Sequence, residues 1–232
     1  MSVCGRQMPS SEEFVFATLR AEMVDVIAMQ ARLVAAMIGR DRFDNRVMAT
    51  MASVPRHDFV PAEFRGLAYL NVPLPIGFGK TISQPFIVAL MTDLLEINVA
   101  DAVLEIGTGL GYQAAILSEM ANRVCTMEII EELAQEARKR LDGLEYRHIE
   151  CRIGDGSRGW PEHAPYDKII VAAAPETIPL TLVGQLKPGG KMVIPVGRED
   201  EQHLYLITKG RDDQIQTKAV LRVSFAPLIL SH

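Results

Sequence analysis

The chain has 232 residues, of which 48% are hydrophobic and 23% are charged, so it can bury a large core as one domain but is short for two. Its formal net charge of −5 and isoelectric point near 5.6 exclude bulk electrostatic attraction to nucleic acid or to an anionic membrane surface. No apolar run approaches the length of a membrane span, and the spacing of the three cysteines and five histidines argues against disulfides and metal ligation, which favours a reducing cytoplasm and no metal.

The N-terminal part of the chain is predicted to be helical. After a polar start at residues 1–12, apolar residues recur at helical spacing from Phe14 to Ile38, which predicts one amphipathic helix. Asp44 is placed to cap a second, short helix that Pro55 ends.

Residues 55–85 are rich in proline, glycine and aromatic residues, and this composition predicts a long loop. A loop of this length inside a compact domain is usually functional. The loop ends in Thr81-Ile82-Ser83-Gln84-Pro85-Phe86 and leads into a helix with an apolar face. Because Ser83 lies just ahead of Pro85, the residues alone favour a structural role for Ser83 as the cap of that helix.

Beyond residue 101, apolar strands alternate with amphipathic helices, as in βαβ units. Three strands are predicted to end at Ile106, Glu128 and Ile153, with a helix after each of the first two. The later elements are expected to be a strand at Lys168–Ala174, a short helix at Leu182–Leu186, a turn at Lys187–Gly190, a strand at Lys191–Val196, and paired strands at His203–Thr208 and Gln214–Val223. The predicted fold is α/β, with a doubly wound, mostly parallel sheet, a C-terminal antiparallel strand pair and an N-terminal elaboration of helices and loop.

The first of these strands runs directly into a glycine-rich turn, Gly107-Thr108-Gly109-Leu110-Gly111. At the carboxyl edge of a doubly wound sheet, such a turn points backbone N–H groups at a ligand. A dinucleotide fingerprint requires glycine or alanine three residues after Gly109, where this chain has Tyr112. Glu105, just before the turn, would repel a pyrophosphate but could accept a hydrogen bond from an amino-acid ammonium group. The turn therefore favours S-adenosylmethionine, with a turn that binds no ligand as the alternative.

Two further acids follow the neighbouring strands. Glu128 ends the second predicted strand, where a carboxylate can take both ribose hydroxyls or can simply open the next helix. Gly154-Asp155-Gly156 follows the third strand, although Asp-Gly is also an ordinary turn pair. Three such signals at three consecutive strand ends indicate one site at the edge of the sheet.

Seven stretches of the chain carry a combined pattern, and they are Val54–Pro61, Pro73–Gly77, Thr81–Pro85, Leu104–Gln113, Gly154–Gly156, Ala172–Pro179 and Leu186–Gly197. Together they resemble the protein-L-isoaspartate O-methyltransferase family over roughly residues 40–230. The glycine turn is common to many methyltransferases, whereas the proline-rich loop through Ser83 and the Ala-Ala-Pro stretch are specific to this family.

The resemblance implies an enzyme that uses S-adenosylmethionine to methylate the α-carboxylate of L-isoaspartyl residues in damaged proteins, after which the ester cyclises to a succinimide. Residues 1–232 would form one methyltransferase domain, in which residues 1–85 supply the N-terminal helices and the active-site loop and residues 86–232 supply the cofactor-binding core. Ser83 would be the catalytic serine. The cofactor would be bound by Thr81, Ile82, Ser83, Glu105, Gly107, Thr108, Gly109, Glu128, Asp155 and Gly156. The substrate groove would include Pro195, Val196, Gly197 and Phe225.

Within the cofactor set, the resemblance implies that Glu105 takes the methionine moiety, Glu128 the ribose, and Asp155 with Gly156 the adenine.

The chain departs from the family pattern at two places. Leu70 and Asn71 stand where an acidic residue is expected, and Lys80 stands where the family loop usually reads Gly-Gln-Thr-Ile-Ser. Together they change the local charge by about two units, which would alter peptide preference or signal lost activity.

Two rival functions stay open at this point, a small-molecule O-methyltransferase on the same sheet and a non-catalytic relative that binds S-adenosylmethionine. A nucleic-acid methyltransferase is disfavoured, because Ala173-Ala174-Pro175-Glu176 has no aromatic residue after the proline to stack on a flipped base. A monomer is expected, since no exposed apolar seam is evident in the sequence.

Overall fold

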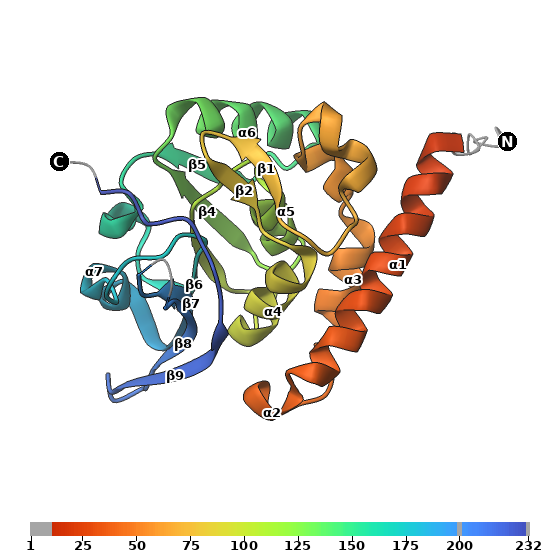
Figure 1. Ribbon diagram of the computed structural model, residues 1–232. Coiled ribbons are helices and arrows are strands. Elements are labelled where there is room, and N and C mark those ends of the chain that lie inside the picture. The colour runs from red at the N-terminus through yellow and green to blue at the C-terminus, as the bar shows by residue number, and fades with distance from the viewer. Residues whose placement is uncertain (1–10, 199–200, 231–232) are drawn as a thin grey trace, which may run out of the picture.

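A computed structural model describes residues 11–198 and 201–230 of the chain (Figure 1). Its centre is a seven-stranded sheet with the order β5-β4-β3-β6-β7-β8-β9. The strands are β3 (Ala102–Ile106), β4 (Arg123–Glu128), β5 (Ile149–Ile153), β6 (Tyr166–Val171), β7 (Leu186–Val196), β8 (His203–Lys209) and β9 (Ile215–Arg222). The strands from β3 to β7 are parallel, whereas β8 and β9 form an antiparallel pair at the edge, as predicted.

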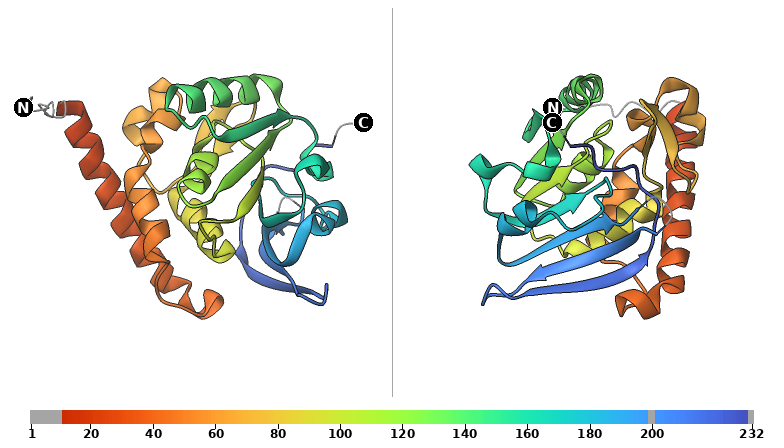
Figure 2. Two further views of the ribbon diagram at one scale, coloured as in Figure 1. Left: turned by 180° about the vertical axis from the view of Figure 1, so that it is seen from behind. Right: turned by 60° about the vertical axis from the view of Figure 1, so that its left-hand side comes forward.

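Helices cover both faces of the sheet, and this explains why its inner strands read as nearly continuous apolar runs (Figure 2). One face packs against α4 (Pro85–Leu95), α5 (Tyr112–Ser118) and α6 (Glu131–Gly143), and the other packs against α7 (Leu180–Gly184). Along β3, Val103 faces the first layer and Leu104 faces the second. The doubly wound α/β arrangement predicted from the sequence is therefore confirmed.

The N-terminal part adds a third layer outside α4, made of α1 (Ser11–Leu33) and α3 (Asn45–Ser53) (Figure 1). The predicted single helix up to Ile38 is interrupted at Val34, after which α2 (Ala35–Ile38) follows. Asp44 caps α3 as predicted, because its side chain accepts a hydrogen bond of 2.7 Å from the backbone N–H of Arg46.

Residues 55–85 contain more regular structure than the predicted loop. Two short 3-10 helices, η1 (Arg56–Phe59) and η2 (Ala62–Leu67), precede a hairpin of β1 (Leu74–Gly77) and β2 (Lys80–Ile82). The two residues of its turn, Phe78 and Gly79, both have positive φ, which is the backbone of a type I′ hairpin turn. Phenylalanine is not a usual residue for the first of these positions, so the sequence did not signal the hairpin.

The structure has no turn at Lys187–Gly190, where one was predicted; these residues lie within β7. The pairing of Tyr166 with Leu186 is followed by that of Lys168 with Lys191, so the intervening residues of β7 bulge out without ending the strand. The preceding strand stops at Val171, earlier than the predicted Ala174. Proline and glycine thus mark a bulge here, which is one of the few places where a strand accepts them.

No helix in the described ranges is both long and apolar enough to cross a membrane. Cys125 and Cys151 are free thiols, and Cys4 lies outside the described residues, as does the predicted polar start up to residue 10.

Candidate active site

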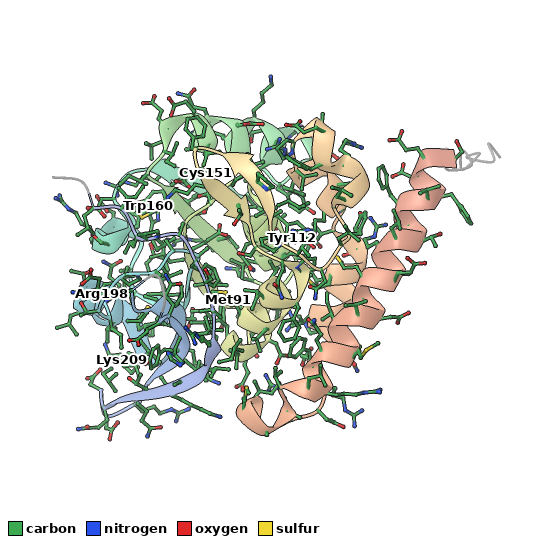
Figure 3. The ribbon with its side chains drawn as sticks, in the orientation of Figure 1. Met91, Tyr112, Cys151, Trp160, Arg198 and Lys209 are labelled. Carbon is green, nitrogen blue, oxygen red and sulfur yellow. The ribbon has the colours of Figure 1, made fainter. Side chains whose placement is uncertain are left out.

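A cavity of about 640 Å³ opens at the carboxyl edge of the sheet, and this volume lies in the usual range for small-molecule sites. The glycine turn after β3 and the ends of β4 and β6 form its floor, and the β1–β2 hairpin with the start of α4 forms one wall. The segment after β9 crosses over as another wall. Met91 and Tyr112, both labelled in Figure 3, are among the lining side chains. Ligand sites of open α/β sheets lie at this edge.

The glycine turn lies close against the neighbouring strands. The backbone N–H of Gly107 donates to the carbonyl of Met127 at 2.8 Å, and a Cβ on Gly107 would lie 3.4 Å from the Cβ of Ala172. Gly107 and Gly109 both have positive φ. Glycine is therefore required here by backbone conformation, and it lets a ligand approach the turn closely.

Glu128 is buried at the end of β4, with its carboxylate held in the cavity wall by three backbone N–H groups. Gly109 donates to one oxygen at 2.9 Å, while Ile129 and Ile130 donate to the other at 2.9 and 3.1 Å. A carboxylate fixed in this way needs little reorganisation to accept further hydrogen bonds from the hydroxyls of a ligand.

Glu105 is fully buried beneath the glycine turn and does not line the cavity. One of its oxygens accepts a hydrogen bond of 2.5 Å from Thr126, whose hydroxyl also lies 2.6 Å from that of Thr108 in the turn. The pKa of Glu105 is raised to about 8, mainly by burial, while the hydrogen bond from Thr126 opposes the rise and the negative charge of Glu128 adds to it. Glu105 is therefore mostly uncharged at neutral pH, unlike the ionised acid assumed from the sequence.

The structure places the other predicted acid, Asp155, in an adjoining hollow of about 330 Å³. Met127 and Gly154 line both hollows, so Asp155 lies next to the main cavity without lining it. Its neighbour Gly156 lines the main cavity, where a Cβ on this residue would lie 2.2 Å from Cγ2 of Ile106. Only glycine fits at that position.

Eight of the ten predicted cofactor residues line the cavity, and the exceptions are Glu105 and Asp155. The eight are Thr81, Ile82, Ser83, Gly107, Thr108, Gly109, Glu128 and Gly156.

Ser83 lines the cavity and does not cap α4. The N-cap residue is Gln84, which makes no side-chain cap bond, and within the described ranges the Ser83 hydroxyl has no hydrogen-bond partner. Asn71 caps the helix in its place, because its side-chain oxygen accepts from the backbone N–H of Phe86 at 2.9 Å. The amide group of Asn71 also donates to Gln30 of α1 at 2.8 Å. The capping role favoured for Ser83 from the sequence is therefore wrong.

The predicted substrate residues fall into two places. Phe225 lines the cavity, and the amide of the buried Gln202 holds its backbone through hydrogen bonds of 2.6 and 3.0 Å. Pro195, Val196 and Gly197 lie at the end of β7 and do not line the cavity, so their role in substrate binding stays a prediction.

The resemblance places Phe225 and Lys80 beside the substrate groove; the structure extends this wall along the C-terminal segment, and it adds the buried Arg56 behind the cavity, which the sequence did not assign. The whole stretch from Leu221 to Ile229 lines the cavity, because the bridge between Ala174 and Pro227 ties the C-terminal segment to the end of β6. Lys80 lines the cavity from the hairpin. The fully buried guanidinium of Arg56 lies over the ring of Tyr112, 5.0 Å from its centroid, at the start of α5.

A group of three side chains that could in principle hold a metal lies elsewhere, with ligand atoms of Cys125, Glu150 and His163 within 4.8 Å of one another. The guanidinium of Arg123 already donates to the Cys125 sulfur at 3.6 Å and lies 3.5 Å from Glu150. A network around this cation accounts for the grouping.

The fold, the glycine turn and the fixed acid at the end of β4 are those of a Rossmann-like methyltransferase that uses S-adenosylmethionine. A model of the protein-L-isoaspartate(D-aspartate) O-methyltransferase family matches residues 29–231. The chain belongs to this family.

Individual relatives agree with this assignment. The chain is 54% identical to protein-L-isoaspartate O-methyltransferase 1 of a Polaromonas species over 213 residues, which cover 92% of this chain and 90% of the relative. It is also 54% identical to the protein of the same name from Cupriavidus necator, over 92% of this chain and 83% of the relative. A solved Plasmodium falciparum structure named for this family, in complex with S-adenosyl-L-homocysteine, is similar in fold, with a TM-score of 0.75, 21% identity, and coverage of 92% of this chain and 98% of that chain.

Proposed function

We propose that this chain methylates the α-carboxylate of L-isoaspartyl residues in damaged cytoplasmic proteins, and that the resulting ester cyclises to a succinimide whose hydrolysis returns some normal aspartyl. Family membership supports this reaction. S-adenosylmethionine, when bound, supplies an electrophilic methyl group on a sulfonium sulfur. The residues of the cavity fit this cofactor, because a fixed carboxylate and a closely approachable glycine turn share one partly apolar space.

The cofactor would be held at three strand ends. Glu128 would accept hydrogen bonds from the ribose hydroxyls, and Gly156 with the adjoining Asp155 would border the adenine. The backbone of the glycine turn would face the methionine end. The predicted contact of Glu105 with that end stays a prediction, since in the structure its carboxyl reaches the turn through Thr126.

The reaction requires no general base from the protein. A substrate carboxyl group has a reference pKa near ~3.9 and is ionised at neutral pH, so it is already a nucleophile. The protein must align this carboxylate and keep water from solvating it. Ser83 has an uncommitted hydroxyl in the wall, and we assign it the role of orienting the carboxylate, while Ile82 and Phe225 help to exclude water.

The observation that carries this proposal is that Ser83 faces the cavity with no structural use for its hydroxyl. Ser83→Ala should lower turnover at least about tenfold, since a hydrogen bond to a charged group is worth about 1.5–3 kcal/mol. Its melting temperature and cofactor affinity should change little. Full turnover in the variant, or a large loss of melting temperature with turnover intact, would contradict the assigned role.

The substrate class is tested by methyl transfer from labelled cofactor to an isoaspartyl peptide, with the aspartyl isomer of the same peptide as the control. We expect label in the isoaspartyl peptide alone. Equal labelling of both peptides would favour a broader O-methyltransferase, and cofactor binding with no transfer to either would identify a non-catalytic relative.

A further inference from the structure

Glu105 is a fully buried acid whose carboxyl group is only half satisfied. Its Oε2 atom accepts a hydrogen bond of 2.5 Å from Thr126, whereas its Oε1 atom has no partner in the described ranges. A buried carboxylate is stable only with a cation or several hydrogen-bond donors beside it, because its charge is costly to remove from water. Glu128, at the end of the neighbouring strand, has three backbone N–H donors. Glu105 therefore lacks what its ionised form requires.

The groups around Glu105 add no positive charge. Among the described residues, the ionisable groups that interact with it are Glu128 of β4 and Cys151 of β5, which is labelled in Figure 3, and both are acids. On α6, which covers the same face of the sheet, Arg138 and Asp142 interact with Cys151. The described parts of β6, α4 and α5 contribute no charge to Glu105. Burial raises its pKa to about 8, so in the free protein at neutral pH it keeps its proton.

Two hydroxyl groups connect this acid with the cavity. Thr126 lies between Glu105 and Thr108, its hydroxyl oxygen is 2.6 Å from that of Thr108, and Thr108 lines the cavity at the glycine turn. When Glu105 is ionised, Thr126 donates to it and accepts from Thr108, so Thr108 offers lone pairs to a ligand. When Oε2 carries a proton, both hydrogen bonds reverse and Thr108 turns its own proton to the cavity. The ionised form thus suits a cationic ligand that donates hydrogen bonds.

We propose that the chain of Glu105, Thr126 and Thr108 couples the binding of S-adenosylmethionine to the release of one proton from Glu105, and that it favours this cofactor over the demethylated product. The inference rests on the proposed function only through the cofactor and does not involve the peptide substrate. The cofactor has positive charge on its sulfonium and ammonium groups, whereas S-adenosyl-L-homocysteine keeps only the ammonium. The released proton passes to the solvent. Loss of the sulfonium charge on methyl transfer weakens the attraction that keeps Glu105 ionised.

The number of protons released is measured by calorimetric titration of the full chain with S-adenosylmethionine at pH 6.5, in buffers of different ionisation enthalpy. We expect the wild type to release about one proton more than Glu105→Gln, since one proton corresponds to about a tenfold change in affinity per unit of pH. The amino group of the ligand and the Glu128 carboxyl are present in both titrations, so the difference isolates Glu105. Glu132→Gln removes an exposed acid of α6 and is the matched control, which should behave as the wild type.

Titration with S-adenosyl-L-homocysteine tests the preference for the cofactor. The wild type should release fewer protons with this product, so the ratio of the affinities for cofactor and product should rise at least about threefold from pH 6 to pH 7.5. The ratio should change less in Glu105→Gln. Thr126→Val is close in shape and removes the hydroxyl that supports the ionised acid, so this second variant should also release fewer protons than the wild type.

Equal proton release by the wild type and Glu105→Gln would overturn the proposal, as would an affinity ratio with the same pH dependence in both proteins. Wild-type proton release by Thr126→Val would overturn the role of the hydroxyl chain. Methyl transfer to an isoaspartyl peptide is measured on the same samples. Proton release without transfer would contradict the proposed function alone, whereas transfer without proton release from Glu105 would contradict this inference alone. A wild type that does not bind the cofactor would overturn both.

Discussion

Replacing Glu105 with glutamine is expected to change how the stability of the protein depends on pH. The Glu105 carboxyl is fully buried, and its Oε1 atom has no hydrogen-bond partner in the described residues. Burial is the main reason that its pKa rises to about 8 in the folded protein, against an ordinary value of 4.5. The folded state therefore keeps a proton that the unfolded chain loses.

The sign of the effect follows from this difference in bound protons. Between pH 4.5 and about 8 the unfolded state binds fewer protons at Glu105, so the free energy of unfolding falls as the pH rises through this window. At pH 7 the group is 7 − 4.5 = 2.5 units above its ordinary pKa, and each unit corresponds to about 1.36 kcal/mol. The buried carboxyl thus costs roughly 3 kcal/mol of stability at pH 7 relative to acid solution. Glutamine keeps the shape and cannot ionise, so it removes this pH-dependent cost.

The measurement is denaturant unfolding of both proteins, without cofactor, at several values of pH from 5 to 8. The difference in unfolding free energy between Glu105→Gln and the wild type should move in favour of the variant by several kcal/mol across this range. Unpaired N–H groups of the new amide add only a constant offset. Glu132→Gln, at an exposed acid on α6, is the control and should follow the wild type. Parallel curves for Glu105→Gln and the wild type would refute the account.

Three further substitutions test two residues of the cavity wall and the cap of α4. Glu128→Ala should weaken S-adenosylmethionine binding about 10- to 100-fold in calorimetry, because a charged hydrogen-bond acceptor is lost. Gly156→Ala should lower stability by about 1–3 kcal/mol in denaturant unfolding, since its methyl group would lie 2.2 Å from Ile106, while Gly154→Ala, whose nearest atom is 3.7 Å away, should have little effect. Asn71→Ala should cost about 1 kcal/mol through the lost cap of α4, whereas Asn71→Asp should keep most of that stability; equal losses in both would contradict the capping role.

The alternating strands and helices of the core were predictable because buried parallel strands and amphipathic helices have distinct periods. The N-terminal elements were harder to predict. The hairpin at residues 74–82 uses Phe78 where a glycine or asparagine would have signalled the turn, and Pro188 with Gly189 marks a bulge in β7 that reads in sequence as a loop. In each case the pairing of strands fixed a conformation that the local sequence did not specify.

The candidate site was likewise predictable only in part from the sequence. The positions of Gly107, Gly109 and Glu128 followed from strand ends, because the carboxyl ends of parallel strands meet at one edge. The side-chain direction of Glu105 did not follow, since one residue earlier or later along a strand faces the opposite layer. The cap of α4 was assigned to Ser83 by proximity in sequence, whereas the group that reaches the helix start belongs to Asn71, which is distant in sequence and adjacent in space.

The two departures from the family pattern have different consequences, and the structure separates them. Asn71 is outside the cavity wall, where it caps α4 and donates to Gln30; a carboxylate there could keep the cap but would lose the donated hydrogen bond. Lys80 lines the cavity, so its ammonium acts on whatever anion binds there. A cation about 4 Å from a carboxylate in a water-like medium contributes about 1 kcal/mol, which is roughly a fivefold gain in affinity. We therefore expect Lys80 to favour acidic peptides, measured as KM for isoaspartyl peptides with and without neighbouring acids, while Ser83 and Glu128 stay in the cavity wall.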